Sequence, residues 1–561
     1  MADRLEVRLH GDQIGWVARG SRRERIEFEW IDGYTPGPVT LTESFGSVRS
    51  KAPSAAASSF FGGYALEGRQ RERLTERRGI SNPTDLYAML REFGSSIAGA
   101  VTISDPDIAS RTQPRYEPIS EGEIIQRLRR AANDGDLGSD DQSRSMLAGY
   151  QPKLLLARFD GKWYLPRGRA HSTHILKPRL RGRPDGLARE HYGHALAAEL
   201  GLARYRTELL GNGARQYLVI ERYDRAVDGE TVTLIHQEDA AQALGLDWVD
   251  EHAKFQDPGA PRDSHRPNAY RIAELLGSLQ GEGRPVADFL RRLTFTVLLG
   301  DNDAHAKNLA ILHLPGRSVL ADVYDAVPKL FQDGRIDYNL ALTIDGSFDH
   351  RRISAAHLVR EAERWNALGT GEAERIVTAT LADFAKALDC VTVPQGVPAP
   401  ATAQLAWNVE RLQAGGEIGE RPSGYRRRRR RLDPSAPPAS RREASDPFGL
   451  TGHGNALHGA HQEPSGQSLN PNRPRGRRSP TRAPDTHTDG GSPWWHTLPI
   501  TEVRHSPLGD TGIEPVISSV SGCRSGQPGS AIDAVTCGGL RGDPSDSPPF
   551  TPFVLGVLGP L

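Results

Sequence analysis

Residues 298–308 read LLGDNDAHAKN, a polar stretch between an apolar run with helical spacing and an apolar run typical of a strand. Before it, apolar residues recur every three or four positions from Pro285 to Gly300, which predicts a helix with one buried stripe. After it, residues 309–314 and 319–324 flank a Pro-Gly turn and predict a hairpin. Functional side chains are often carried by loops that a rigid scaffold positions. We therefore predict that this stretch is a catalytic loop.

Asp303 and Asn308 in this stretch are five residues apart. Enzymes that transfer phosphoryl groups use this spacing to place a base near the acceptor hydroxyl and an amide oxygen on a metal ion. Asp325 follows the predicted hairpin, where a second metal ligand is needed. The pattern is also compatible with a polar cluster of Asp303 and His305 that caps the loop. A zinc site at His305 and His313 is disfavoured, because no further ligand has a suitable spacing.

The chain before this loop predicts five strands and one helix in a defined order. A turn with one glycine at 148–151 precedes two strands joined by Asp160-Gly161, a dipeptide that favours tight hairpins. A third strand ends at Lys177 and is stopped by Pro178. The predicted strands cover 154–159, 163–165, 173–178, 206–210 and 216–222, and the helix, between the third and fourth strands, covers 187–200. This is the order of elements in the N-lobe of a protein kinase.

Transfer of a phosphoryl group from ATP needs a backbone cover and a cation on the phosphates, an acid that holds the cation, a base, and metal ligands. A flexible ammonium suits the phosphate contact better than a planar guanidinium, which favours Lys177, with Glu190 of the predicted helix as its acid. Taken singly, Lys177 could be a solvated strand end and Glu190 a surface acid, but their order along the chain argues against coincidence. The full prediction is Asp303 as catalytic base; Ala148, Gly149, Tyr150, Gln151, Lys153, Lys177, Glu190 and Lys307 at the ATP; and Asn308 and Asp325 as Mg²⁺ ligands.

The chain has 561 residues, equal numbers of acidic and basic residues and a hydrophobic content of 37%, which is low for a wholly globular chain. The zero net charge predicts neither nucleic acid nor a membrane surface as partner. Cys390, Cys523 and Cys537 are too few and too widely spaced for a disulfide framework, which indicates a reducing compartment. No stretch is long and apolar enough to span a membrane. We therefore expect a cytoplasmic protein with no membrane partner.

Five regions are predicted, together an α+β chain. The last of them is rich in Pro, Gly, Ser and Arg, and its run Arg426–Arg431 is more simply a solvated charge run than a phosphate-binding arm. Residues 509–521 resemble the product of a reading frame that runs on through a transfer-RNA gene, which leads to the hypothesis that this region is spurious. The first region, 1–105, is a small α+β module with a strand at 5–10 and a helix at 86–93, and the second, 106–144, is a flexible connection with a helix at 121–132. The third, 145–225, is the N-lobe, and the fourth, 226–395, is a mainly helical C-lobe with helices at 237–245, 268–280, 354–368 and 371–388. The fifth, 416–561, is a disordered tail.

Four motifs together closely resemble the HipA family, whose members are bacterial serine/threonine kinases that act as toxins. The motifs are MLAGYQPK at 146–153, STHILKP at 172–178, QED at 237–239 and DAHAKN at 303–308, within a resemblance that spans about residues 3–395. The resemblance implies a two-lobed kinase-like fold that uses ATP and Mg²⁺. It also implies a small HipB-like helix-turn-helix antitoxin, through which the operator DNA is mainly contacted. In the best-studied members the substrate is an aminoacyl-tRNA synthetase, whose phosphorylation halts translation and favours persistence.

The motif at 146–153 departs from the family at its first position. The family usually has a serine there, and its autophosphorylation silences the kinase, whereas this chain has Met146. Ser145 is the candidate acceptor in its place, with Ser143 nearby. Two alternatives to a toxin kinase are a catalytically weak pseudokinase that acts as co-repressor with a helix-turn-helix partner, and a small-molecule phosphotransferase. The complete set of predicted site residues disfavours the first. The N-terminal module, together with the run QED at 237–239, disfavours the second.

Overall fold

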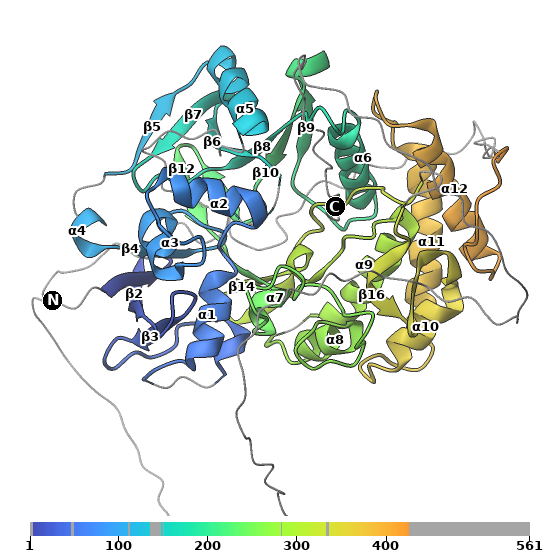
Figure 1. Ribbon diagram of the computed structural model, residues 1–561. Coiled ribbons are helices and arrows are strands. Elements are labelled where there is room, and N and C mark those ends of the chain that lie inside the picture. The colour runs from blue at the N-terminus through green and yellow to red at the C-terminus, as the bar shows by residue number, and fades with distance from the viewer. Residues whose placement is uncertain are drawn as a thin grey trace, which may run out of the picture. The chain divides into compact units, whose positions relative to one another are not determined.

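A computed structural model describes residues 4–46, 50–109, 113–134, 147, 149, 151–281, 283–331 and 336–425 (Figure 1). All of these residues belong to one unit that spans 1–433. The fold is α+β, with a small N-terminal domain and two kinase-like lobes. Several predictions fall on positions outside the described residues, namely those for Ser143, Ser145, Met146, Ala148, Tyr150 and the chain from residue 426 onward.

The N-terminal domain is built on an antiparallel sheet with the strand order β3-β2-β1-β4. Its first strand alternates, as the sequence predicted, and buries Leu5, Val7 and Leu9. The predicted helix at 86–93 is also confirmed, and the Asp85 side chain caps it by accepting a hydrogen bond from the Ala88 amide. The elements are β1 (Arg4–Leu9), β2 (Asp12–Arg19), β3 (Ile26–Trp30), η1 (Glu43–Phe45), α1 (Ser54–Gly62), α2 (Gly68–Arg77), α3 (Leu86–Phe93), β4 (Val101–Ser104) and α4 (Pro106–Ala109).

The N-lobe has a six-stranded sheet with the order β5-β7-β6-β8-β10-β9. Asp160 and Gly161 both have positive φ, of 47° and 75°, so the dipeptide forms the tight hairpin that it predicts. The elements are β5 (Arg115–Pro118), α5 (Glu121–Asp134), β6 (Leu154–Phe159), β7 (Lys162–Arg167), β8 (His174–Pro178), α6 (Gly186–Glu199), β9 (Thr207–Leu210), η2 (Gly213–Arg215) and β10 (Tyr217–Glu221). The predicted order of three strands, a helix and two strands is therefore confirmed.

The helix predicted at 121–132 is confirmed by α5, but the flexible connection predicted around it at 106–144 is wrong for residues 113–120. Residues 115–118 form β5, which pairs antiparallel with β7 at the edge of the N-lobe sheet. The helix α5 packs on the same sheet through Ile124 and Leu128, which share a core cluster with Leu154 and Leu176. An edge strand of four residues without clear alternation has no signal of its own, because its partner strand lies about fifty residues further along the chain.

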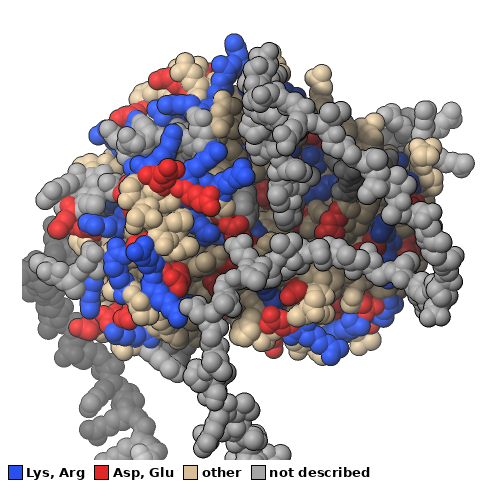
Figure 2. Space-filling view, in the orientation of Figure 1, with Lys and Arg blue, Asp and Glu red and all other residues tan. Residues whose placement is uncertain are grey.

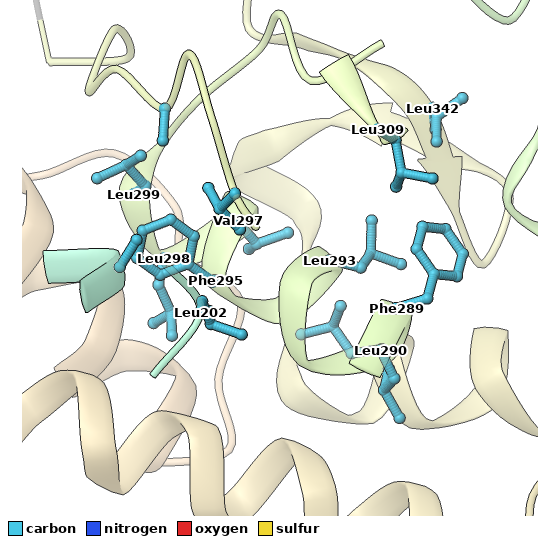
Figure 3. Close-up of a cluster of buried hydrophobic side chains, with 14 of the residues drawn as sticks. Leu202, Phe289, Leu290, Leu293, Phe295, Val297, Leu298, Leu299, Leu309 and Leu342 are labelled. Atoms are coloured by element: carbon cyan, nitrogen blue, oxygen red, sulfur yellow. The ribbon is translucent and has the colours of Figure 1, made fainter. Parts of the chain in front are cut away.

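The C-lobe is organised around the predicted helix before the catalytic loop. This helix buries the expected Phe289, Leu293 and Val297, but it also buries Phe295 and Leu298 on other sides. Figure 3 shows these side chains beside Leu202, Leu309 and Leu342. The helix is buried almost all round because other helices pack on it. The elements are α8 (Ala269–Gly277), α9 (Pro285–Leu299), η3 (Ala306–Asn308), β14 (Ala310–Leu314), β15 (Arg317–Leu320), β16 (Asn339–Ile344), β17 (Ser347–Asp349), η4 (His350–Arg352), α10 (Ala355–Glu363) and α11 (Glu372–Cys390).

The ordered C-lobe extends beyond its predicted end at residue 395. A further helix, α12 (Ala399–Gln413), packs beside α11 and α9 (Figure 1). Asn408 on it donates a hydrogen bond to the Leu298 carbonyl at 3.0 Å. Ile418, which was predicted to lie in the disordered tail, is fully buried, and its amide bonds the Ile353 carbonyl at 3.0 Å. The predicted tail boundary at 416 is therefore wrong, because residues 416–425 return to the lobe.

The segment between the lobes contains more strand than predicted. It forms the hairpin β11 (Arg225–Asp228) and β12 (Thr231–Leu234), then β13 (His236–Asp239) and the short helix α7 (Ala240–Ala243). The predicted helix at 237–245 is therefore wrong in its first half. Gln237 and Glu238 are buried because they pair with β14. Asp239 then starts α7 as a capping box with Gln242, so a strand ends where the helix begins.

The N-terminal domain shares buried contacts with the rest of the unit. Trp248 of the C-lobe belongs to the hydrophobic core of the N-terminal domain and donates a hydrogen bond to the Glu24 carbonyl at 3.1 Å. Its indole lies against Gly62, where a Cβ atom would come within 2.2 Å of the ring. At a second contact, the Gly99 amide bonds the buried Asp224 carboxylate at 2.9 Å. The domain is therefore fixed to the lobes by packing and by hydrogen bonds.

The visible surface carries both charge signs in a mixed pattern. Figure 2 shows Lys and Arg side chains intermingled with Asp and Glu side chains over this face, in keeping with the zero net charge. Within the described ranges, no helix has the length and apolar character needed to cross a membrane.

Candidate active site

The predicted catalytic loop begins where α9 ends. Gly300 adopts a left-handed conformation with φ of 64°, and its carbonyl accepts hydrogen bonds from the Lys329 and Leu330 amides at 3.0 Å each. Asp301 then turns inward, and its carboxylate accepts the amides of Asp303 at 3.1 Å and Val327 at 3.3 Å. Asp301 thus ties the start of the loop to the segment that follows Asp325.

The predicted base Asp303 is partly exposed, and its Oδ2 lies 3.1 Å from Lys329 Nζ. The same ammonium lies 3.0 Å from Asp301 Oδ1, so one lysine serves both carboxylates. His305 Nε2 is 3.8 Å from Asp303 Oδ1. Burial lowers the pKa of His305 to about 4, so the imidazole is neutral near pH 7. The charge partner of Asp303 is therefore Lys329 and not His305.

Asn308 is held so that its oxygen remains available. Its side-chain nitrogen donates a hydrogen bond to the Asp303 carbonyl at 2.8 Å. Because a carbonyl can only accept, this contact fixes which end of the amide is nitrogen. The side-chain oxygen of Asn308, Oδ1, can then coordinate a metal ion.

Lys177, Glu190 and Asp325 meet although they come from a strand, a helix and a loop. Lys177 Nζ lies 2.7 Å from Glu190 Oε1 and 2.6 Å from Asp325 Oδ1. Asp325 has a positive φ of 57°, which aspartate tolerates better than most residues. Burial disfavours the charge on Lys177, but the two carboxylates outweigh it and raise the pKa of the ammonium. The sequence predicted the Lys177–Glu190 pair, and the structure places Asp325 on the same ammonium.

The two carboxylates on Lys177 have different electrostatic environments. Burial raises the pKa of Glu190, whose side chain is 7% exposed, and Lys177 only partly offsets this effect. The Asp325 side chain is 38% exposed, and Lys177 holds the pKa of that carboxyl well below its usual value against the effect of burial. Asp325 is therefore the ionised partner, and Glu190 is the one better placed to carry a proton.

The predicted phosphate-covering turn is described at Gly149 and Gln151. Gly149 has a φ of 122°, and a Cβ atom there would lie 2.8 Å from Lys153 Nζ. Lys153 is buried, and burial together with the charge of Lys177 lowers its pKa to about 8. Gln151 is half-buried at the end of the turn. Gly149 and Lys153 thus lie close together, near the charge of Lys177.

Lys307, predicted to contact ATP, is engaged elsewhere. Its ammonium lies 2.6 Å from Glu67 Oε1 of the N-terminal domain. The Lys307 carbonyl accepts a hydrogen bond from the Tyr324 hydroxyl at 2.6 Å. The structure therefore brings Lys153, Glu190 and Asp325 toward Lys177 and Asn308 toward Asp303, and it directs the Lys307 side chain toward a different domain.

Three residues of the site escaped the sequence analysis, namely Asp301, Lys254 and Lys329. A usable signal was present, since the chain has only eight lysines among 70 basic residues. Five of these lysines lie in or beside the site, namely Lys153, Lys177, Lys254, Lys307 and Lys329. Lys254 and Lys329 fall outside the recognised motifs. At these five positions a compact ammonium suits the contact better than a planar guanidinium, whereas lysines such as Lys162 are simply exposed.

We expect replacement of Gly193 by alanine to destabilise the protein by about 1–3 kcal/mol, because its Cβ would overpack a filled space. The new atom would lie 2.1 Å from the Ala326 carbonyl oxygen, in the segment next to Asp325. Gly193 lets α6 approach that segment, so that Glu190 and Asp325 both reach Lys177. The measurement is the free energy of unfolding in urea.

The matched control is Gly186→Ala in the same helix, where the new Cβ would meet only Arg183 Cβ at an ordinary 3.6 Å. Because alanine favours helices over glycine by about 1 kcal/mol, this variant is expected to be neutral or stabilised. Equal stability of the two variants would contradict the role of Gly193.

The comparisons with known proteins agree with this geometry. Residues 5–104 match the family model for the HipA N-terminal domain, and residues 145–388 match that for the HipA-like C-terminal domain. The chain is 34% identical over 332 residues to "Putative kinase Y4mE" of Sinorhizobium fredii, covering 57% of this chain and 76% of that one. It is 29% identical over 361 residues to "Serine/threonine-protein kinase toxin HipA" of Shewanella oneidensis, covering 63% and 81%.

A solved structure shows the same fold. The HipA chain in a complex of Shewanella oneidensis HipA, HipB and operator DNA superposes with a TM-score of 0.60 at 23% identity. The match covers 73% of this chain and 97% of that chain.

Proposed function

This chain belongs to the HipA family of kinases, and on that premise we propose that it is an ATP- and Mg²⁺-dependent serine/threonine protein kinase that acts as the toxin of a toxin–antitoxin pair. The observation that carries the proposal is the position of Lys177 between Glu190 and Asp325. In protein kinases, a lysine paired with a helix acid binds the phosphates, and an aspartate beside it binds the metal. A pseudokinase that acts only as co-repressor would have no need of this arrangement.

The Mg²⁺ ligands would be Asn308 and Asp325. Asn308 offers an amide oxygen, since its nitrogen is taken by the Asp303 carbonyl, and Asp325 offers an ionised carboxylate. Oxygen ligands of this kind suit Mg²⁺, which usually keeps only one or two protein carboxylates and completes its shell with water and phosphate oxygens. The bound ion would neutralise charge that develops on the phosphates during transfer. When ATP binds, the Lys177 ammonium is available to its phosphates while Glu190 keeps the side chain oriented.

Asp303 would orient the acceptor hydroxyl and take its proton. Its carboxylate is partly exposed and lies 3.1 Å from the Lys329 ammonium, and a carboxylate within reach of a hydroxyl can accept its proton. Asp301 and the Gly300 turn hold Asp303 in place from within the lobe. Reaction then needs no covalent enzyme intermediate, because positioning and charge neutralisation supply most of the rate enhancement in this class.

The proposed partners follow from the family. We infer that a small HipB-like helix-turn-helix antitoxin binds this chain and that operator DNA is contacted mainly through the antitoxin. The proposed substrate is a component of translation, such as an aminoacyl-tRNA synthetase. The proposed self-silencing acceptor is Ser145, in the position next to the one that the family usually gives to serine.

The test is expression of the wild-type chain and of Asp303→Ala in a heterologous bacterium, with growth and phosphoprotein content followed together. The wild type is expected to stop growth and to add phosphate to serine or threonine, and loss of the base should reduce transfer by about 10³-fold. Asp228→Ala, in an exposed hairpin of the same chain, is the control and should behave as wild type. Equal growth arrest by Asp303→Ala and wild type would refute a toxicity that depends on kinase activity.

A further inference from the structure

Glu67 of the N-terminal domain lies between two lysines of the C-lobe. Its Oε1 is 2.6 Å from Lys307 Nζ and its Oε2 is 2.7 Å from Lys254 Nζ. The Glu67 side chain is 7% exposed, and the side chains of Lys307 and Lys254 are 13% and 6% exposed. Against the effect of burial, the two lysines hold the pKa of Glu67 well below its usual range. One ionised carboxylate thus joins two cations that come from different segments.

Lys307 lies in the catalytic loop, and Lys254 lies in a segment that supports it. The Lys254 carbonyl accepts a hydrogen bond from the Ala306 amide at 3.1 Å. Lys307 directly precedes the proposed metal ligand Asn308. The Lys307 carbonyl accepts a hydrogen bond of 2.6 Å from the hydroxyl of Tyr324, which directly precedes Asp325. Glu67 therefore closes a ring of contacts that runs from Lys254 through Ala306 and Lys307 of the loop and back to Glu67.

The backbone of Glu67 is fixed to the same part of the C-lobe. The next residue, Gly68, donates its amide to Glu251 Oε1 at 2.8 Å, and the Arg71 guanidinium lies 3.2 Å from the same oxygen. Trp248, three residues before Glu251, packs in the core of the N-terminal domain. The carboxylate of Glu67 is thus delivered to the loop by a rigid interface.

A contribution to stability is a poor explanation for this cluster. Removing three charges from water is costly, and buried ion pairs are often replaceable by apolar residues without loss of stability. A buried charge instead restricts geometry, because a buried ammonium that leaves its carboxylate partner becomes an uncompensated charge. Here the geometry specified is that of the loop that carries Asp303 and Asn308.

We propose that Glu67 is a positioning residue through which the N-terminal domain holds the catalytic loop in its active conformation. Lys307 then serves as the anchor of this loop and not as a contact to ATP. The inference rests on the proposed kinase function for its effect on rate, but its effect on the loop is independent of catalysis.

The test compares the full chain with its Glu67→Gln variant, which keeps the shape of the side chain and removes its charge. The kcat of Glu67→Gln is expected to fall by about 100-fold, because a loop displaced by about 1 Å misplaces the base. The KM for ATP is expected to stay within about threefold, since Lys177 and its partners are unchanged. In hydrogen exchange followed by mass spectrometry, peptides covering 301–309 are expected to lose protection.

Two further variants separate positioning from a general role in the interface. Glu251→Gln alters the same interface without touching the loop, and it is expected to retain kcat within about twofold whatever stability it loses. Glu67→Gln combined with Lys307→Met is expected to cost little more in kcat than Glu67→Gln alone, because both act through one contact.

The proposal is overturned if Glu67→Gln keeps the wild-type kcat, if its loop exchanges as in wild type, or if Glu251→Gln loses kcat to the same extent. Absence of phosphoryl transfer by the wild type would instead refute the proposed function. In that case the exchange of residues 301–309 still decides whether Glu67 holds the loop.

Discussion

Replacement of Lys177 by methionine is expected to lower kcat/KM for phosphoryl transfer by at least about 100-fold, the usual cost of removing one preorganised electrostatic contact. The Lys177 ammonium lies 2.7 Å from Glu190 and 2.6 Å from Asp325, so both carboxylates share it. Methionine has a similar length but no charge, so the phosphates of ATP would face two acids with no ammonium between them.

The measurement is single-turnover transfer from labelled ATP, with ATP affinity determined by calorimetry. The matched control is Lys162→Met, at the exposed start of β7, which should match wild type in both assays. Full activity of Lys177→Met would remove the basis for treating the Lys177 cluster as the ATP site.

Replacement of Trp248 by alanine is expected to reduce the free energy of unfolding by about 3–5 kcal/mol, the usual cost of truncating a buried tryptophan. Trp248 is 7% exposed and fills a space in the core of a different domain from its own. The cavity cannot close easily, because Gly62 opposite the indole has no side chain to fill it. The hydrogen bond from the indole to the Glu24 carbonyl would also be lost.

Urea denaturation followed by circular dichroism checks this prediction. Tyr270, which is 47% exposed, provides the control, since truncating an exposed side chain usually changes stability by less than about 0.5 kcal/mol. An unchanged denaturation midpoint for Trp248→Ala would show that the N-terminal domain does not depend on this contact.

Local rules predicted those parts of the fold whose signals lie within one element. The α9 helix was predicted from its apolar spacing and from Gly300. A glycine after the last apolar residue is a helix stop signal, because glycine readily adopts the left-handed conformation that ends a helix. The hairpin at Asp160-Gly161 was predicted because few residues tolerate two consecutive positive φ angles. The pairing of Lys177 with Glu190 followed from an order of elements that matches a known kind of active site.

Other elements depend on partners that are distant in sequence. The residues of β5 become a strand because β7 offers an open edge, and Gln237 and Glu238 extend because β14 pairs with them. The spacing of Leu405, Val409 and Leu412 could have indicated α12, but the composition around it resembled that of the tail. In these places the tertiary context overrode a weak local preference.

The sequence by itself determined the family, the order of the two lobes and the predicted chemical roles of Lys177, Asp303, Asn308 and Asp325, since these follow from residue types at set spacings. Only the tertiary structure decided the partner of Lys307, because Glu67 is 240 positions away along the chain and 2.6 Å away in space. The strength of a charge interaction depends on the distance between the charges and on the polarity of their surroundings, and neither follows from sequence separation. For the same reason, the contribution of the N-terminal domain to the catalytic loop emerged only once the domains were folded together.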